Sequence, residues 1–311
     1  MKLLITGALG HIGSRLIHDL KPGDFTEVVL VDNMATQRYA SLFNLPSGVP
    51  FRFVEADITS ADLKSLFSGM DVVIHLAAIT NAAGSFEIQD QVERVNYDGT
   101  EIVARACAAV GARLIFLSTT SVYGVQDEVV NEDCPTESLK PQSPYADSKI
   151  RSERFLEQLA RSDGLRFISC RFGTIYGVSA GMRFHTAVNK FAYQACLGQP
   201  LTVWRTALHQ RRPYLDLGDA VRALTFIVKK DLFDGKVYNV LTDNLTVNDV
   251  VEALKRLVPD TIVNFVDSKI MNQLSYTVSN LRFSQKGFQF TGSYEVALEE
   301  TVNRLKNIRQ A

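Results

Sequence analysis

Short apolar runs alternate with helix-like segments along the first half of the chain. The runs cover residues 3–6, 28–31, 51–55, 72–75, 114–118 and 167–170, and helical periodicity is clearest over 11–20, 89–110 and 144–161. Strands that are apolar on both faces are typical of a sheet that helices cover on each side. The alternation therefore predicts an α/β fold built on a parallel, doubly wound sheet.

The alternation stops near Gly173, and 311 residues exceed the size of one average domain. We therefore predict two parts. The main domain spans residues 1–173, and a helix over 217–230 with a strand over 237–240 brings residues 214–240 back to its sheet. Residues 174–213 and 241–311 are predicted to form a smaller, mixed α/β C-terminal lobe.

The charge and the rare residues limit the partners of the chain. The formal net charge is −1, so no basic field favours nucleic acid or an anionic membrane. The four cysteines lack CxxC spacing and the five histidines lack an HExxH motif, so we predict neither disulfides nor a metal site. No apolar run has the length of a membrane span, and the first predicted strand begins at Lys2. We therefore expect a cytoplasmic protein without a signal peptide.

A glycine-rich turn, Gly7-Ala-Leu-Gly10-His11-Ile12-Gly13, joins the first predicted strand to the first predicted helix. Gly7 permits a tight turn, Gly10 lets the backbone approach a pyrophosphate, and Gly13 lets the helix pack closely on the sheet. The start of the helix, with His11 and Ile12, offers free N–H groups to phosphates. A glycine turn without a ligand explains the spacing equally well, so a Rossmann-type dinucleotide site needs support from further residues.

Asp32 supplies that support, because it ends the second predicted strand 19 residues after Gly13. A carboxylate at this place accepts hydrogen bonds from ribose hydroxyls and repels a 2′-phosphate, which favours NAD over NADP. The nearby Arg38 leaves NADP open, and a solvated strand-end aspartate is the alternative interpretation. Further predicted contacts with the dinucleotide are Asn33, Asp57, Ile58, Leu76, Ala77 and Ala78, which follow the second, third and fourth strands.

Tyr145 and Lys149 lie one helical turn apart, just after a predicted helix start at Ser143-Pro144. Residues at i and i+4 share one face of a helix. A lysine ammonium and an oxidised nicotinamide cation both favour the phenolate, so we expect the pKa of Tyr145 below its ordinary value near 10. Tyr145 would then accept a proton from a substrate hydroxyl while hydride leaves the same carbon. An exposed tyrosine and lysine pair is the alternative, because this spacing is common by chance.

With these motifs in this order, the chain resembles the extended short-chain dehydrogenase/reductases, in particular the nucleotide-sugar epimerase/dehydratase family. The resemblance covers nearly the whole chain and implies NAD as the cofactor. Besides the glycine turn and the Tyr145 motif, the matching segments are residues 31–33, 75–78, 95–100, 118–124, 171–177 and 212–219.

The resemblance also implies roles for single residues. Tyr145 would be the base, Lys149 would hold the cofactor ribose and tune the tyrosine, and Thr119 would supply the catalytic hydroxyl. Asn96 would support the cofactor site. The substrate would be a nucleotide-diphosphate sugar, and its predicted contacts are Thr80, Thr120, Thr174, Arg183, Asn189 and Arg212.

Thr120 and Ser121 depart from the family's 4,6-dehydratases, which have Asp-Glu after the catalytic threonine. Hydroxyls cannot perform that acid and base chemistry at neutral pH. We therefore predict an NAD-dependent epimerase that acts at the sugar C4 through a 4-keto intermediate. A nucleotide-sugar 4-dehydrogenase or 4-ketoreductase is the alternative. A non-enzymatic NAD-sensing protein fits less well, because Tyr145, Lys149 and Thr119 are all present.

Two further expectations come from the resemblance. A second phosphate-binding arginine is absent from residues 271–275, and Arg282 is the candidate replacement. The helices over 89–110 and 144–161 are expected to pair with their mates in a homodimer.

Overall fold

The computed structural model describes residues 1–126, 129–267, 276–305 and 307–308. Seven strands form the main sheet, in the order β11-β7-β5-β4-β1-β2-β3, and every neighbouring pair is parallel. This confirms the predicted doubly wound α/β sheet. The strands are β1 (Lys2–Thr6), β2 (Glu27–Asp32), β3 (Phe51–Glu55), β4 (Val72–His75), β5 (Arg113–Thr119), β7 (Phe167–Phe172) and β11 (Val237–Val240).

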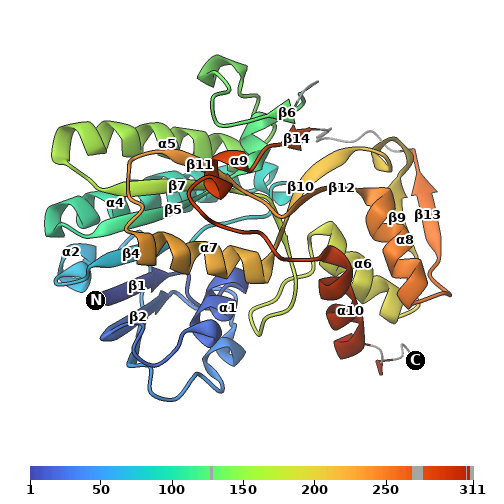
Figure 1. Ribbon diagram of the computed structural model, residues 1–311, viewed down its shortest axis with the longest axis horizontal. Helices are drawn as coiled ribbons and strands as arrows, with labels where there is room; N and C mark the ends of the chain where they lie inside the picture. The colour runs from blue at the N-terminus through green and yellow to red at the C-terminus, as the bar shows by residue number, and fades with distance from the viewer. Residues whose placement is uncertain (127–128, 268–275, 306, 309–311) are drawn as a thin grey trace.

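Helices cover both faces of this sheet (Figure 1). On one face lie α2 (Leu63–Phe67), α4 (Gly99–Val110) and α5 (Pro144–Asp163). On the other face lie α1 (His11–Asp19) and α7 (Leu217–Lys230). Each central strand is therefore shielded on both sides, which is why the sequence shows continuous apolar runs there.

The helix expected over residues 89–110 is interrupted in its middle. It consists of α3 (Gln89–Val92), a π-helical stretch (Glu93–Asp98) and α4. Such wider turns are frequent at functional sites. The stretch contains the predicted site residue Asn96.

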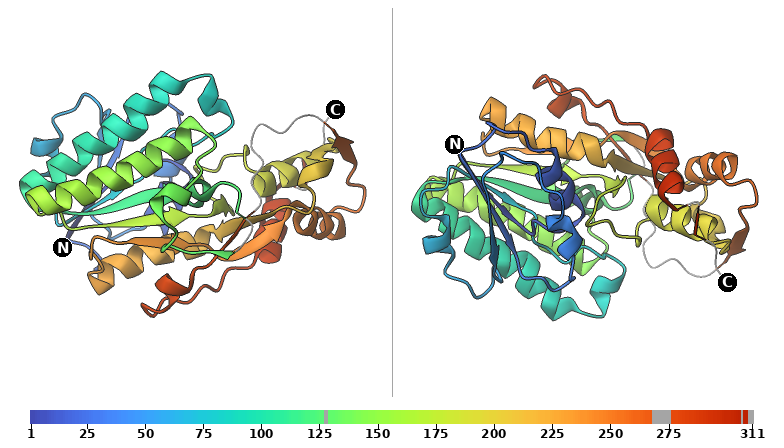
Figure 2. Two further views of the ribbon diagram at one scale, coloured as in Figure 1. Left: turned by 90° about the horizontal axis from the view of Figure 1, so that it is seen from above. Right: turned by 90° about the horizontal axis from the view of Figure 1, so that it is seen from below.

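A second lobe lies beside the main domain (Figure 2). Its own apolar core includes Phe191, Leu201, Leu254 and Leu298. The sequence shows few strand signals over 174–213, but three strands start there, each of them short. The elements of the lobe are β8 (Thr174–Tyr176), α6 (Ala187–Cys196), β9 (Leu201–Trp204), β10 (Arg211–Asp216), β12 (Asp243–Thr246), α8 (Val247–Leu257), β13 (Val263–Val266) and α10 (Tyr294–Leu305).

The two parts are more interwoven than the sequence suggests. Strand β11 pairs with β7, and α7 packs against α1, so residues 217–240 lie against the main sheet, whereas residues 214–216 end β10 of the lobe. The short helix α9 (Leu281–Ser284) also packs there, because the buried Phe283 contacts Phe226 and Phe288 at centroid distances of 5.8 and 5.0 Å. This aromatic segment, which the sequence analysis assigns to the lobe with the rest of residues 241–311, thus packs in the core of the main sheet.

Two very short strands, β6 (Val129–Val130) and β14 (Thr277–Val278), form a separate parallel pair. Within the described part of the chain, no helix combines the length and the apolar character that crossing a membrane requires.

Candidate active site

The strand order reverses between β1 and β4, because the chain first adds β2 and β3 on one side and then returns to the other. In such sheets the crevice at the carboxyl ends of these two strands is the usual ligand site. The predicted cofactor residues and Thr119 lie near these carboxyl ends. Gly7 follows β1, Asp32 ends β2, Leu76 follows β4 and Thr119 ends β5.

The glycine turn is shaped by close backbone contacts. Gly7 has a φ of +65°, and a Cβ on it would lie 2.6 Å from the backbone nitrogen of Ala77. A Cβ on Gly13 would lie 2.4 Å from the carbonyl oxygen of Ala8. Helix α1 starts without a side-chain cap and without an acidic residue in its first turn. The backbone N–H groups at its start therefore suit a pyrophosphate.

Asp32 is held beside this turn. Its carboxylate accepts hydrogen bonds from the backbone nitrogens of Leu9 (3.1 Å) and Met34 (3.0 Å), and its remaining lone pairs fit ribose hydroxyls. The Arg38 guanidinium lies near Gly10, 3.8 Å from where a Cβ would stand. Burial lowers the pKa of Arg38, and the Asp32 carboxylate opposes this shift. The turn thus combines a carboxylate for ribose with a cation for phosphate, and both fit a dinucleotide.

The other predicted cofactor residues line the neighbouring strand ends. Asp57 accepts hydrogen bonds from Asn33 (3.0 Å) and from the backbone nitrogen of Thr59 (2.8 Å), and Ile58 is buried. The Asn96 side chain accepts from the nitrogen of Ile79 (2.8 Å) and donates to its carbonyl oxygen (2.9 Å). Asn96 therefore fixes the backbone that follows Leu76, Ala77 and Ala78, and a direct contact with the cofactor stays a prediction.

Tyr145 and Thr119 come together at the start of α5. Ser143 caps this helix by accepting from the nitrogen of Ala146 at 3.2 Å, as its position predicts. Thr119 lies close enough to Tyr145 to lower the pKa of the tyrosine, and the Thr119 hydroxyl oxygen accepts from the nitrogen of Ser121 at 3.1 Å. A substrate oxygen bound between the two side chains could form hydrogen bonds with the hydroxyls of both Tyr145 and Thr119.

The pKa of Tyr145 differs from expectation. Burial raises it above the ordinary value, and the nearby Arg183 and the Thr119 hydrogen bond offset only part of this shift. The chain alone therefore does not lower the pKa of its tyrosine, as the sequence led us to expect. A lowering requires the charges of bound ligands in addition to Lys149.

Lys149 is buried one turn further along α5, with 3% of its surface exposed. Its ammonium lies 4.7 Å from the centroid of the Phe116 ring. Burial lowers the pKa of Lys149 to about 7. His75 lies near it and is held between Thr6 (2.7 Å) and Thr100 (3.1 Å). Burial and the Lys149 charge lower the pKa of His75 to about 3, so His75 is neutral at physiological pH.

The Thr120 hydroxyl, directly after Thr119, joins β7 to Tyr276. Thr120 donates to the carbonyl oxygen of Phe172 (3.3 Å), and Tyr276 donates to Thr120 (3.5 Å). Burial raises the pKa of Tyr276, which Arg212 on β10 partly offsets. Thr120, Tyr276 and Arg212 therefore form one neighbourhood that links the lobe to the reacting hydroxyls.

Three other predicted substrate residues, Arg183, Thr174 and Asn189, differ in how they are held. Arg183 donates to Thr80, and burial lowers its pKa to about 10. Thr174 is partly buried at the start of β8. Asn189 is fully buried and bonded to the nitrogen of Gly177 (3.3 Å) and the carbonyl oxygen of Arg183 (3.1 Å). A contact between Asn189 and substrate would need these bonds to open.

The Arg282 guanidinium is already engaged by carboxylates and is therefore a poor replacement for the phosphate-binding arginine. It pairs with Glu132 and Asp133 after β6. Residues 271–275, where the sequence lacks the family's arginine, lie outside the described residues.

Sequence reasoning missed Phe116, His75 and Tyr276 as parts of the site. Phe116 and His75 lie within apolar runs that predict only buried strands, and their position beside Lys149 follows from the folded structure alone. Tyr276 is 131 residues after Tyr145, so no local spacing indicates their proximity.

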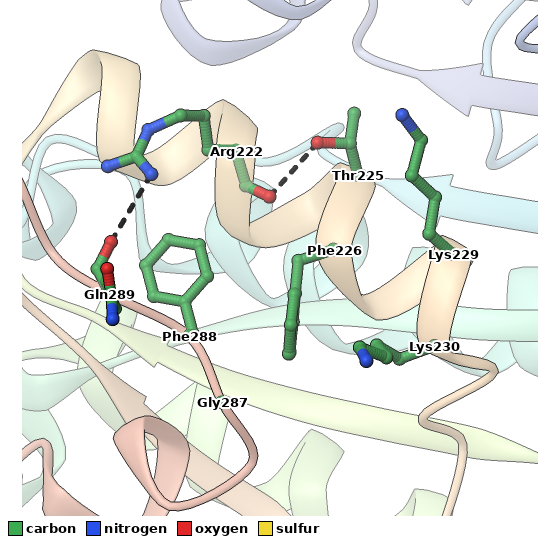
Figure 3. A pocket seen from close by; sticks show the side chains of 8 residues that line it. All are labelled: Arg222, Thr225, Phe226, Lys229, Lys230, Gly287, Phe288 and Gln289. Atoms are coloured by element: carbon green, nitrogen blue, oxygen red, sulfur yellow. Dashed lines mark hydrogen bonds between the residues drawn. The ribbon is translucent and has the colours of Figure 1, made fainter.

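A hollow of about 480 Å³ lies away from this site, between α7 and the segment at Gly287 (Figure 3). Phe226 and Phe288 form its apolar part, and Arg222 bonds the carbonyl oxygen of Gln289. None of the predicted site residues lines it.

The comparisons with known proteins identify the family of the chain. The model of the NAD dependent epimerase/dehydratase family matches residues 3–240. The chain belongs to this family, which confirms the predicted resemblance and NAD as its cofactor.

Individual relatives are similar over most of the chain. A trifunctional UDP-glucose 4,6-dehydratase/UDP-4-keto-6-deoxy-D-glucose 3,5-epimerase/UDP-4-keto-L-rhamnose-reductase of Arabidopsis thaliana is 30% identical over 97% of the chain, which spans only 46% of the plant protein. An uncharacterized UDP-glucose epimerase of Bacillus subtilis (strain 168) is 31% identical, with 77% of this chain and 76% of that protein covered.

Among solved structures, UDP-glucuronic acid 4-epimerase from Bacillus cereus, in complex with UDP-glucuronic acid and NAD, superposes with a TM-score of 0.89. It is 26% identical, and 99% of each chain is covered.

Proposed function

We propose that this chain is an NAD-dependent nucleotide-sugar epimerase that inverts C4 through a 4-keto intermediate. The proximity of Tyr145 and Thr119, with buried Lys149 one helical turn after Tyr145, carries the proposal. Thr120 and Ser121 support it, because they place hydroxyls where a dehydratase needs an acid and a base.

Each residue has a defined task in this reaction. Tyr145 accepts the proton of the sugar 4-hydroxyl, and Thr119 donates a hydrogen bond to the same oxygen. The Lys149 ammonium stabilises the phenolate form of Tyr145. The glycine turn and Asp32 would hold NAD, which would supply reversible hydride transfer to either face of C4. Tyr145 then gives the proton back, so the overall reaction is redox-neutral.

Charged groups suit the diphosphate of the substrate. Arg212 and Arg183 belong to the second lobe, and both act electrostatically on tyrosines near the reacting hydroxyls. Binding the remote diphosphate through them orients the sugar for proton and hydride transfer. The relatives from Bacillus cereus and Bacillus subtilis favour a UDP-sugar.

One incubation tests the reaction class. Purified protein is mixed with UDP-, GDP-, CDP- and dTDP-sugars, and the products are analysed by mass spectrometry and NMR. An epimerase gives a product of unchanged mass with inverted C4. A mass change of two hydrogens would identify the dehydrogenase or ketoreductase instead, and loss of water would show a dehydratase. Either of these outcomes would refute the epimerase proposal.

A further inference from the structure

One segment crosses the crevice between β1 and β4. We call residues 177–183 the strap; it leaves β8 and leads towards α6. Asn189 holds both of its ends, since it bonds the nitrogen of Gly177 and the carbonyl oxygen of Arg183. The strap therefore has a defined shape, set from the lobe.

On the β1 side, the strap is fastened to α1. His11 Nε2 lies 2.9 Å from the carbonyl oxygen of Gly177, and Ser14 accepts from the nitrogen of Gly181 at 3.0 Å. Ser179 donates to the carbonyl oxygen of His11 at 2.9 Å. A carbonyl oxygen can only accept, so His11 carries its proton on Nε2.

The strap touches the glycine turn itself at Gly181. A Cβ there would lie 2.4 Å from the carbonyl oxygen of Leu9 and 2.7 Å from that of Gly10. Only glycine allows this approach. On the β4 side, Arg183 donates to Thr80. The strap thus extends across the crevice, from α1 on the β1 side to Thr80 on the β4 side.

The strap also has room to withdraw. A hollow of about 350 Å³ borders Gly177 and Val178 on the side of Arg15 and Asp216. This part of the strap therefore borders open space and not packed side chains.

We propose that His11 and Ser14 latch the strap over the glycine turn and so retain NAD through many turnovers. This rests on the proposed function, because an epimerase must regenerate its cofactor in place, whereas a net dehydrogenase must exchange it. His11 and Ser14 are positioning residues, and release of the cofactor requires the latch to open.

Cofactor exchange tests the latch without any sugar. The NAD-loaded enzyme is diluted into excess fluorescent etheno-NAD, and the release of NAD is followed over time. His11→Phe and Ser14→Ala each remove one buried hydrogen bond and should accelerate release on the order of tenfold. Gly181→Ala should accelerate it more, because the strap can no longer approach the turn.

Helix α1 provides a matched control. His18 Nε2 lies 3.0 Å from the carbonyl oxygen of Ser41, away from the strap, so His18→Phe should leave the release rate unchanged. Equal release from His11→Phe, Ser14→Ala, Gly181→Ala and the parent enzyme would overturn the latch, as would equal acceleration by His18→Phe. Because the readout contains no substrate, it stands whether or not the sugar panel shows epimerisation.

Discussion

At the scale of single residues, the proposed reaction depends on the Tyr145 hydroxyl as the proton acceptor. Tyr145→Phe removes the proton acceptor and keeps the ring, so turnover should fall on the order of 10³-fold while NAD stays bound. Steady-state kinetics on the best sugar of the panel and the NAD content of the purified variant measure both effects. Tyr193→Phe, at an exposed tyrosine of α6, is the control and should remain active. Near-native turnover of Tyr145→Phe would disprove the assignment of the base.

Lys149 makes stability depend on pH. Its pKa is about 7 in the folded chain, against an ordinary lysine value of 10.5. Between these values the unfolded chain binds more protons than the folded one, so stability rises with pH through this window and falls as pH drops towards 7. From pH 6 to pH 9, cofactor-free protein should therefore gain about 2.7 kcal/mol that Lys149→Met does not gain.

Urea unfolding at the two pH values measures this difference. Lys190→Met, at an exposed lysine of α6, should keep the pH dependence of the parent protein. If Lys149→Met shows the same dependence as the parent protein, the ammonium is not destabilised by burial.

Residue patterns predicted the parts of the site that follow strand ends. Gly7, Asp32 and Thr119 each stand next to a recognisable apolar run, so their meeting at one edge of the sheet follows from parallel strands. Patterns could not give the pKa of Tyr145, because burial of its ring depends on contacts between distant segments. For the same reason, they could not show that Asn189 holds the strap.

At the scale of elements, a buried ion pair joins α5 to β7. Arg171 donates to both oxygens of Glu153, at 3.0 and 2.7 Å, and both side chains are 6% exposed. Glu153→Gln leaves the guanidinium charge buried without its counterion, which should destabilise the fold by roughly 3–5 kcal/mol. Glu101→Gln, which breaks an exposed pair with Arg105 on α4, should cost less than about 1 kcal/mol.

Denaturant unfolding of the two variants checks this comparison. An equal loss of unfolding free energy in Glu153→Gln and Glu101→Gln would mean that burial does not increase the cost of breaking the ion pair. Because Lys149 lies one turn before Glu153, loss of the pair should also disturb the segment of α5 that carries Lys149.

Element boundaries were predictable where apolar periodicity ends sharply. Residues 217–230 and 237–240 carry a helix and a strand with these bounds, because a capping aspartate at Asp216 and a glycine at Gly235 flank them. The π-helical stretch was not predictable, since the hydrophobic pattern continues through it. The short strands of the lobe contain too few residues to show a period.

At the scale of the whole molecule, the family resemblance implies a homodimer through α4 and α5. Light scattering should then give about twice the 34.6 kDa mass of one chain. Ile102 on α4 is 37% exposed, and Ile102→Lys should shift the mass towards one chain. Val296→Lys, at an exposed position of α10, is the control. A single-chain mass for the parent protein would refute the dimer.

The aromatic segment around Phe283 has a consequence for how this enzyme can be altered. The polypeptide enters the nucleotide-binding half in three separate stretches, the last of them close to its C-terminal end. Exchange of the second lobe for that of a relative cannot be made with one cut, since an N-terminal fragment alone would lose the phenylalanine contacts of Phe283 and Phe288. A chimera that changes specificity must keep residues 217–240 and 281–290 together with the parental first half.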